Sequence, residues 1–273
     1  MTAERPVRVA VAQLAVGTDR GANVAAAVAA VDEAAARSSD LVVLPEYASA
    51  YDRHGVGPRL AEPLGGPFIA ALRERAAATG VAVIAGTSLP SDDPGRAVNA
   101  VVAVDGDGGI VGVYRKAHLY DAFGARESDV LEAGPADAPP TVLTVRGLRF
   151  GVLTCYDLRF PESARRCVDV GADVLVVPAA WVDGPLKAMQ WRALAVARAI
   201  ENTAAVVAVG MAGRGLTGRS LVVGPDGLVV LELDEAPGLA TADLDPAQVS
   251  RVRTTNPSLA NRRYRVVPLP TRP

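Results

Sequence analysis

The chain has 273 residues, of which 50% are hydrophobic and 21% are charged, and its net charge is −2. This balance predicts a soluble globular protein with a sizeable core, and the absence of a Lys/Arg cluster argues against nucleic acid or an anionic membrane surface as a partner. The longest apolar stretches, such as 203–213, have about half the length that a bilayer requires, and the N-terminus lacks the basic start of a signal peptide. We therefore expect a cytoplasmic protein without a membrane segment.

Strands and helices alternate through the first half of the chain. The expected strands are apolar and β-branched, and they occupy residues 8–14, 41–44, 81–86, 99–104 and 110–114, the last two forming a hairpin. One helix is expected to run from Asn23, as its cap, to about residue 38. Pro67 opens a second helix, which Gly80 closes.

The second half repeats this alternation. Strands are expected at 148–153, 173–177 and 204–209, followed by a hairpin of 220–223 with 228–231. A helix at 161–170 precedes a longer one with an apolar stripe of Leu186, Met189, Ala193, Ala197 and Ile200. Because no Pro/Gly/Ser linker separates the halves, residues 1–273 are expected to form a single α/β domain with mixed sheets.

Cysteine and histidine are scarce. Cys155 and Cys167 are too few for a disulfide framework, and His54 and His118 form no cluster with metal-ligand spacing. We expect neither a disulfide scaffold nor a metal site. Cys167 lies inside the predicted helix at 161–170 and is interpreted as a small buried hydrophobic residue.

Lysine is also scarce, because only Lys116 and Lys187 among the 28 basic residues are lysines. The bias towards arginine carries no function by itself, but an ammonium, unlike a guanidinium, has a pKa that burial and neighbours can move. Lys187, in the first turn of a predicted helix, is most simply a solvated charge. Lys116 ends a predicted strand, and the residues around it, at 115–121, favour a functional role over that of an edge-strand lysine.

Three predicted strands end in a reactive side chain. Glu46 follows the strand at 41–44, Lys116 follows 110–114, and Cys155 follows 148–153. Open α/β sheets place ligands beyond such strand ends. A carboxylate, an ammonium and a thiol suit acyl transfer, in which Glu46 accepts the thiol proton, Cys155 attacks a carbonyl or nitrile carbon, and Lys116 stabilises the charge that develops on the substrate.

At these residues the chain resembles the nitrilase, or carbon-nitrogen hydrolase, superfamily, with its Glu-Lys-Cys triad. The three signature segments are 44–47 (LPEY), 114–121 (YRKAHLYD) and 153–162 (LTCYDLRFPE). Further similar segments follow at 178–181, 191–202, 218–220, 243–245 and 261–263. The resemblance implies a four-layer α-β-β-α sandwich, no metal or organic cofactor, and assembly into homodimers or larger homo-oligomers.

The resemblance also implies roles for single residues. Glu46 would be the general base, Lys116 the cation of the oxyanion site, and Cys155 the nucleophile that forms a thioester. The backbone N–H of Tyr156 would complete the oxyanion site. A second glutamate in a Glu-Ser pair is matched by Glu127-Ser128, with Glu132 as the weaker alternative because no serine follows it.

The segment after the cysteine is similar to the amidase branch that acts on ω-amides of keto acids and on deaminated glutathione. Related carbamoylases carry an arginine at the position of Arg159 to hold a substrate carboxylate, and a bidentate guanidinium suits that task. The other reading of Arg159 is an ion pair with Asp157 or Glu162. Trp181 would form a pocket wall, or else be a buried core aromatic. We therefore expect hydrolysis of a small carboxylate-bearing amide to acid and ammonia, with an N-carbamoyl amino acid amidohydrolase or a nitrilase as alternatives.

Three other readings are weaker. A Cys-His hydrolase would use His118 as base, but the sequence reveals no Asn or Asp to orient it. A nucleotide site at 210–215 lacks the Gly-x-Gly-x-x-Gly order. A non-catalytic interaction protein with the same fold predicts no difference in thiol reactivity between Cys155 and Cys167.

Overall fold

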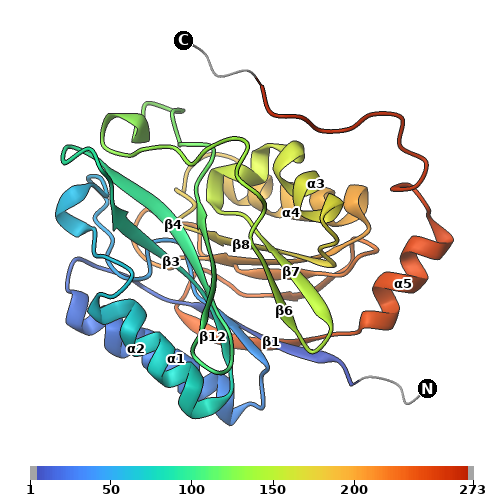
Figure 1. Ribbon diagram of the computed structural model, residues 1–273, viewed down its shortest axis with the longest axis horizontal. Helices are drawn as coiled ribbons and strands as arrows, with labels where there is room; N and C mark the ends of the chain where they lie inside the picture. Colours follow the sequence, from blue (N-terminus) through green and yellow to red (C-terminus); the bar gives the residue numbers. More distant parts are fainter. Residues whose placement is uncertain (1–4, 270–273) are drawn as a thin grey trace.

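Two six-stranded sheets form the centre of the molecule, and the computed structural model describes residues 5–269 (Figure 1). The strands of the first sheet are, in spatial order, β12 (Gly238–Leu244), β1 (Val7–Gln13), β2 (Leu41–Val43), β3 (Ala82–Pro90), β4 (Ala97–Val104) and β5 (Ile110–Arg115). Those of the second sheet are β11 (Val229–Glu232), β10 (Leu221–Val223), β9 (Ala205–Gly210), β8 (Val174–Ala179), β7 (Leu148–Val152) and β6 (Val142–Val145).

Both sheets are mixed, as predicted. In the first sheet β1, β2 and β3 are parallel neighbours, β12 and β4 pair antiparallel with them, and β5 pairs antiparallel with β4. In the second sheet β7, β8 and β9 are parallel, β6 and β10 pair antiparallel with them, and β11 pairs antiparallel with β10. Each sheet therefore has a parallel centre, whose strands all end at the same edge.

Helices cover the outer face of each sheet (Figure 1). The helices are α1 (Arg20–Ala36), α2 (Pro67–Thr79), α3 (Pro161–Asp169), α4 (Lys187–Asn202) and α5 (Pro246–Thr255). Side chains of α1 and α2 pack on the first sheet in one apolar cluster, and those of α3 and α4 pack on the second sheet in another. A third cluster fills the space between the two sheets. The predicted four-layer α-β-β-α sandwich is confirmed.

Strand alternation divides residues between these clusters. In β2, Leu41 and Val43 face the second sheet, whereas Val42 between them faces α1 and α2. Such short strands, buried on both faces, read as continuous apolar runs rather than as alternating patterns. This is why the sequence locates them by length and β-branching.

The start of α1 differs from the expected one. Asp19, not Asn23, caps the helix, and its carboxylate accepts a hydrogen bond from the Ala22 N–H at 3.1 Å. Asn23 is buried inside the helix, where its amide donates to the carbonyl oxygens of Gly17 and Ser49. Asn23 therefore fastens the preceding loop to the helix.

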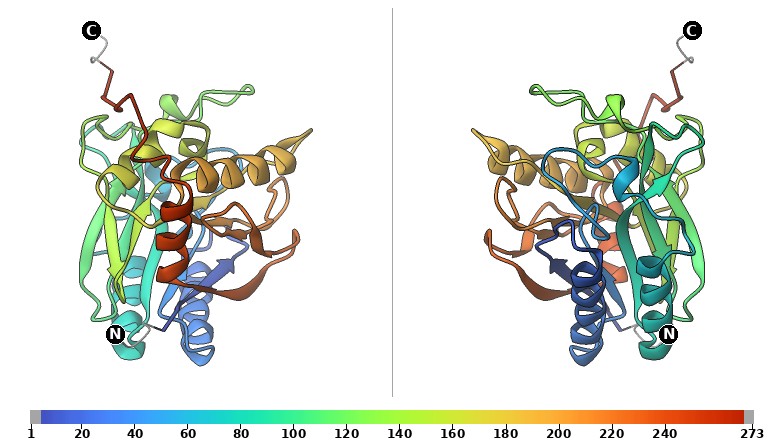
Figure 2. Two further views of the ribbon diagram at one scale, coloured as in Figure 1. Left: turned by 90° about the vertical axis from the view of Figure 1, so that its right-hand side faces the viewer. Right: turned by 90° about the vertical axis from the view of Figure 1, so that its left-hand side faces the viewer.

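The apolar stripe expected on α4 is not its buried face. Leu186, Met189 and Ile200 are 65%, 55% and 49% exposed. The buried face instead carries Trp191, Ala195, Arg198, Ala199 and Asn202. The donor groups of its polar members find partners, since Arg198 donates to the Leu158 carbonyl and Asn202 donates to the Arg198 carbonyl. The stripe lies on the outer surface, where α4 projects at the side of the molecule (Figure 2).

Several elements have no counterpart in the sequence-based expectation. These are β6, β12, α5 and three short 3₁₀ turns, η1 (Pro58–Leu60), η2 (Glu127–Asp129) and η3 (Cys155–Arg159). The helix α5 lies at the edge of the sandwich, and the chain after it runs along the outside (Figure 2). Cys167 is buried in the cluster under α3, as expected. Within residues 5–269 no helix combines the length and the apolar character needed to cross a membrane.

Gly86 of β3 allows the segment after β2 to lie against the sheet. A Cβ at this position would clash with the Cα of Glu46, and it would lie 2.7 Å from the Pro45 carbonyl oxygen and 2.8 Å from the Tyr47 backbone nitrogen. All three are backbone atoms, which cannot move aside as a flexible side chain would. Glycine is therefore required for Glu46 to reach its position.

We expect Gly86→Ala to lower the free energy of unfolding by about 1–3 kcal/mol, because the added methyl overpacks a buried backbone contact. Urea unfolding followed by circular dichroism measures this change. Gly65→Ala is the matched control, since a Cβ there meets no atom within 4 Å. The control should stay within about 0.5 kcal/mol of wild type. Equal free energies of unfolding for the two variants would contradict the role of Gly86 in allowing this close backbone contact.

Candidate active site

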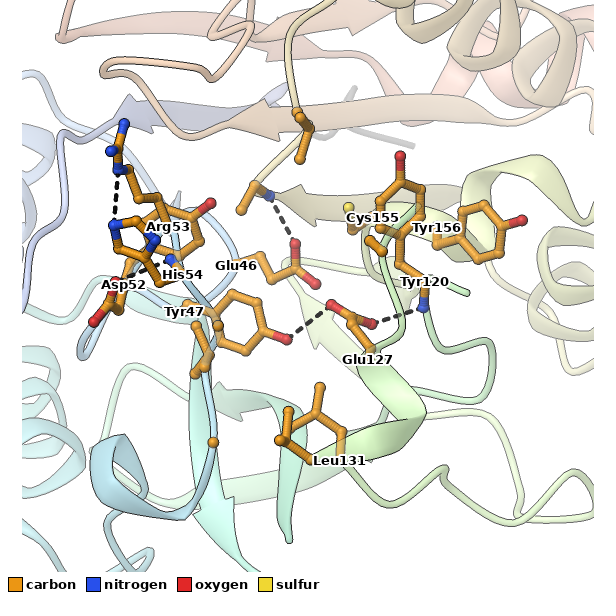
Figure 3. Close-up of a pocket in the computed structure, with 18 of the residues that line it drawn as sticks. Glu46, Tyr47, Asp52, Arg53, His54, Tyr120, Glu127, Leu131, Cys155 and Tyr156 are labelled. Atoms are coloured by element: carbon orange, nitrogen blue, oxygen red, sulfur yellow. Dashed lines mark hydrogen bonds between the residues drawn. The ribbon is translucent and has the colours of Figure 1, made fainter. Parts of the chain in front are cut away.

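Three strand ends from two sheets converge at one edge of the sandwich. Glu46 follows β2 and Lys116 follows β5 in the first sheet, whereas Cys155 follows β7 in the second. A cavity of about 580 Å³ opens there (Figure 3). Its lining includes the predicted site residues Glu46, Glu127, Cys155, Tyr156, Arg159 and Trp181. The structure thus brings all of these predicted residues together, and Lys116 lies directly behind Glu46 and Glu127.

Lys116 is almost completely buried, with 1% of the residue exposed, as is Glu46. Its Nζ donates to Glu46 Oε1 at 3.0 Å and to Glu127 Oε2 at 2.8 Å. Burial alone would lower the pKa of Lys116, but the carboxylates of Glu127 and Glu46 outweigh burial and raise it well above its usual value. The side chain is therefore an ammonium that two carboxylates share.

Glu46 is held from three sides. Its Oε1 accepts from Lys116 and from Asn99 Nδ2 at 2.7 Å, and its Oε2 accepts from the backbone N–H of Ala180 at 2.7 Å. Asn99 belongs to β4 of the first sheet, whereas Ala180 follows β8 of the second. The carboxylate is therefore fixed in one orientation and bridges the two sheets beside the cavity (Figure 3).

Glu127, not Glu132, faces the cavity. Glu127 Oε1 accepts from the Tyr47 hydroxyl at 3.1 Å, and Oε2 accepts from the Tyr120 N–H at 2.8 Å (Figure 3). Glu132 forms an ion pair with Arg115 at 2.8 Å and accepts a hydrogen bond from Ser91. It is not one of the described residues that line the cavity. Of the two glutamates that the sequence left open, the geometry therefore favours Glu127.

Cys155 occupies a strained turn between β7 and α3. Its φ of 45° lies in the left-handed region, which non-glycine residues seldom adopt, and it is the first residue of η3. Burial, followed by the charge of Glu46, raises the pKa of the Cys155 thiol well above its usual value, although Lys116 opposes the shift. The thiol is therefore protonated at neutral pH and needs a base to become a nucleophile.

Asp157, which the sequence did not single out, fixes the turn. Its buried carboxylate accepts from the Thr154 N–H at 3.1 Å and from the Tyr114 hydroxyl at 2.7 Å. It also accepts from the His118 N–H at 3.1 Å and contacts His118 Nδ1 at 2.7 Å. These bonds join the turn of Cys155 to the segment that follows Lys116. The capping-box spacing of Thr154 and Asp157 was the available signal.

His118 does have an aspartate partner, contrary to the expectation from the sequence. However, its ring stacks on Phe160 with centroids 3.7 Å apart, and His118 is not among the described residues that line the cavity. It belongs to the network around Asp157. The arrangement therefore disfavours His118 as the base for Cys155.

Arg159 and Trp181 form one wall of the cavity. The Arg159 guanidinium lies 4.9 Å from the centre of the Trp181 ring and donates to Gln190 Oε1 at 2.8 Å. Within residues 5–269 it forms no ion pair with Asp157, Glu162 or any other carboxylate. Trp181 lines the cavity and also packs on Trp191, with ring centroids 5.2 Å apart. Both readings of Trp181 therefore apply.

Lys187 is not a solvated surface charge, contrary to the expectation. Only 8% of the residue is exposed, and it lines the cavity. Leu186, directly before it, has a φ of 64°, and this left-handed turn starts α4 with the lysine side chain directed inward. The scarcity of lysine in the chain was the one sequence signal for this residue.

Comparison with known proteins agrees with this geometry. The family model described as carbon-nitrogen hydrolase matches residues 8–254. A deaminated glutathione amidase from Escherichia coli O157:H7 is 42% identical over 234 residues, which cover 85% of this chain and 88% of that protein. A 2-oxoglutaramate amidase from Bacillus subtilis is 32% identical over 231 residues, which cover 82% of this chain and 85% of that protein.

A solved structure shows the same fold. The crystal structure of Nit3 from Saccharomyces cerevisiae, described as a member of branch 10 of the nitrilase superfamily, superposes with a TM-score of 0.83. The two sequences are 26% identical, and the match covers 96% of this chain and 98% of that one. Together with the family match and the two amidase relatives, this places the chain: it is an enzyme of the carbon-nitrogen hydrolase family.

Proposed function

We propose that this carbon-nitrogen hydrolase cleaves a small carboxylate-bearing amide to an acid and ammonia through a thioester on Cys155. The observation that carries the proposal is the buried Glu46–Lys116 pair beside a protonated thiol, at the wall of a cavity that also holds an unpaired arginine. Base, cation and nucleophile are thus present together with a group that can bind a substrate carboxylate.

The first half-reaction forms the acyl-enzyme. Glu46 takes the proton of the Cys155 thiol as the sulfur attacks the amide carbon. The negative charge that develops on the amide oxygen is stabilised by the Lys116 ammonium and the Tyr156 backbone N–H. The tetrahedral intermediate collapses when Glu46 returns the proton to the leaving nitrogen. Ammonia departs and a thioester remains.

The second half-reaction regenerates the thiol. Glu46 removes a proton from a water molecule, whose oxygen attacks the thioester carbon, and the same oxyanion site stabilises the charge. The carbon–sulfur bond then breaks, and the sulfur takes the proton from Glu46 as the acid is released. Glu127, bonded to Lys116 at 2.8 Å, positions the ammonium and the substrate amide throughout.

The class of substrate is inferred from Arg159, which lines the cavity. The names of the relatives specify a 2-oxoglutaramate amidase and a deaminated glutathione amidase, and 2-oxoglutaramate bears a carboxylate at the end opposite its amide. Arg159 is the group that could hold such a carboxylate. The raised pKa of Cys155 supports the general-base step, since a neutral thiol next to two carboxylates does not ionise by itself.

We further propose assembly into a homodimer or larger homo-oligomer. The exposed apolar side chains of Leu186, directly before α4, and of Met189 and Ile200 on it support it, because exposed apolar side chains favour protein contacts. The single-domain organisation of residues 1–273 and the cytoplasmic location remain predictions.

A panel of α-keto ω-amides, N-carbamoyl amino acids and nitriles tests the reaction. We expect wild type to release ammonia fastest from the α-keto ω-amides and Cys155→Ala to show no turnover, because the thioester cannot form. Coupled ammonia detection measures both proteins. Cys167→Ala is the matched control, as that thiol is buried away from the cavity. If no compound gave ammonia above the Cys155→Ala background, the proposal would be wrong. Fastest release from a nitrile or carbamoyl compound would favour those alternatives.

Lys116→Arg tests the oxyanion role. The variant keeps the positive charge, but a wide planar guanidinium cannot occupy the site between Glu46 and Glu127 with the same geometry. We expect kcat to fall by about 100- to 1000-fold, the usual cost of losing an oxyanion donor. Steady-state kinetics on the best amide measures this loss. Near-normal turnover would show that only charge, and not shape, matters at this position.

The state of the thiol can be measured directly. Because burial and Glu46 raise the pKa of Cys155, the protonated form should persist from about pH 6 to about pH 9. Ultraviolet absorbance of the thiolate, taken as the difference between wild type and Cys155→Ala, should stay flat over this range. A thiolate signal that rises below about pH 7 would instead indicate a preformed ion pair with Lys116.

A further inference from the structure

Both lysines of the chain lie at the same cavity. All the other basic residues are arginines, yet Lys116 stands behind the cavity and Lys187 lines it. The proposed reaction uses Lys116 but assigns no task to Lys187. Lys187 is therefore a buried cation at the cavity that has no role in the proposed chemistry. We ask which group of a substrate it could bind.

Aromatic groups and one hydroxyl surround Lys187. Its Nζ lies 3.7 Å from the centre of the Phe123 ring and donates to the Tyr120 hydroxyl at 2.8 Å. The indole N–H of Trp181 donates to the Lys187 carbonyl oxygen at 3.1 Å and so holds the backbone. The ammonium is thus fixed at the cavity wall by cation–π and hydrogen-bond contacts rather than by an acid.

Three other cations at the cavity contact acids, whereas Arg53, which also lines it, donates to the His54 ring at 3.2 Å. Arg59 pairs with Asp52 at 2.9 Å, and Arg126 lies 3.5 Å from Asp129. Lys116 is shared by two glutamates, as described above.

Arg159 and Lys187 are different. Neither forms an ion pair with any carboxylate of residues 5–269, and Arg159 Nε has no hydrogen-bond partner. Burial, and next the charge of Arg159, lower the pKa of Lys187. Two cations therefore repel each other in a partly desolvated wall, which an anion between them would stabilise.

The two cations face the same rings. The Arg159 guanidinium is 5.7 Å from the Phe123 centroid and 4.9 Å from the Trp181 centroid, and the Lys187 ammonium is 3.7 Å and 5.9 Å from the same two centroids. A group of carboxylate size placed against these rings can contact both cations. The cavity continues from this wall to Cys155, so an extended molecule can reach the thiol with its other end.

We propose that Lys187 is a substrate-binding residue that, together with Arg159, holds the carboxylate at the end of the acyl chain opposite the scissile amide. The inference rests on the proposed amidase function and specifies its substrate recognition. Lys187 supplies a compact ammonium, which the Tyr120 hydroxyl and the Phe123 ring hold in place at the cavity wall. The site thereby selects amides with a distal carboxylate over neutral amides of the same length.

A matched pair of amides tests this role. Glutaramate and pentanamide have the same carbon chain and the same scissile amide, but only glutaramate carries a distal carboxylate. The ratio of their kcat/KM values reports how strongly the carboxylate is recognised, and a general defect in folding or in the triad would cancel from it. For wild type we expect glutaramate to be preferred by at least about 100-fold, since charge-assisted hydrogen bonds of this kind are worth roughly one to two orders of magnitude each.

Lys187→Met should reduce this preference by about 10- to 100-fold, chiefly through a higher KM for glutaramate. Lys187→Arg should recover only part of it, because the guanidinium does not fit the same contacts. Arg192→Met is the matched control on the same helix. It also removes one positive charge, but from an exposed ion pair with Glu232 outside the cavity, and it should leave the ratio unchanged.

Two results would overturn the inference. A wild-type enzyme that hydrolyses both amides without preference has no such carboxylate site, and this measurement needs no variant. If Arg159→Met abolished the preference while Lys187→Met kept it, Arg159 alone would read the carboxylate. By contrast, a wild type that releases ammonia from no amide would contradict the proposed function itself.

Discussion

The active site depends on one buried ammonium that two carboxylates share. Removing Lys116, Glu46 and Glu127 from water costs several kcal/mol for each ion, and this cost is repaid only where every remaining lone pair and proton finds a partner. The surrounding donors provide this compensation from distant parts of the chain, namely Asn99, the Ala180 N–H, the Tyr47 hydroxyl and the Tyr120 N–H. Charge compensation therefore determines where the segments with these donors lie, as much as apolar packing does.

The same cluster determines how the thiol works. Burial raises the pKa of the Cys155 thiol most, and the negative charge of Glu46 adds to this effect, so the sulfur stays neutral until a substrate arrives. A preformed thiolate would react with any electrophile that entered the cavity. A neutral thiol with a fixed base acts only when an acyl carbon and an oxyanion site are both in place, which links reactivity to substrate geometry.

The residues next to strand ends could be predicted from the sequence, whereas those placed by distant contacts could not. Glu46, Lys116 and Cys155 each follow a recognisable apolar strand, so local pattern and strand-end geometry suffice. Lys187 follows no strand, and only the left-handed turn at Leu186 directs it inward. The buried face of α4 was misassigned because two polar side chains, Arg198 and Asn202, take core positions that periodicity reserves for apolar residues, and both donate hydrogen bonds there. The edge strand β12 escaped notice since its partner β1 lies more than 200 residues away in the sequence.

The bond between Glu46 and the Ala180 backbone joins the two sheets across 134 residues of chain. Because Glu46 follows a strand of the first sheet and Ala180 follows a strand of the second, this bond exists only once the two sheets have docked. A half-folded chain therefore has a cysteine but no oriented base, and it cannot form the thioester from an amide. Catalytic competence thus appears together with sheet docking. A newly made chain can cleave amides only once its two sheets have packed against each other.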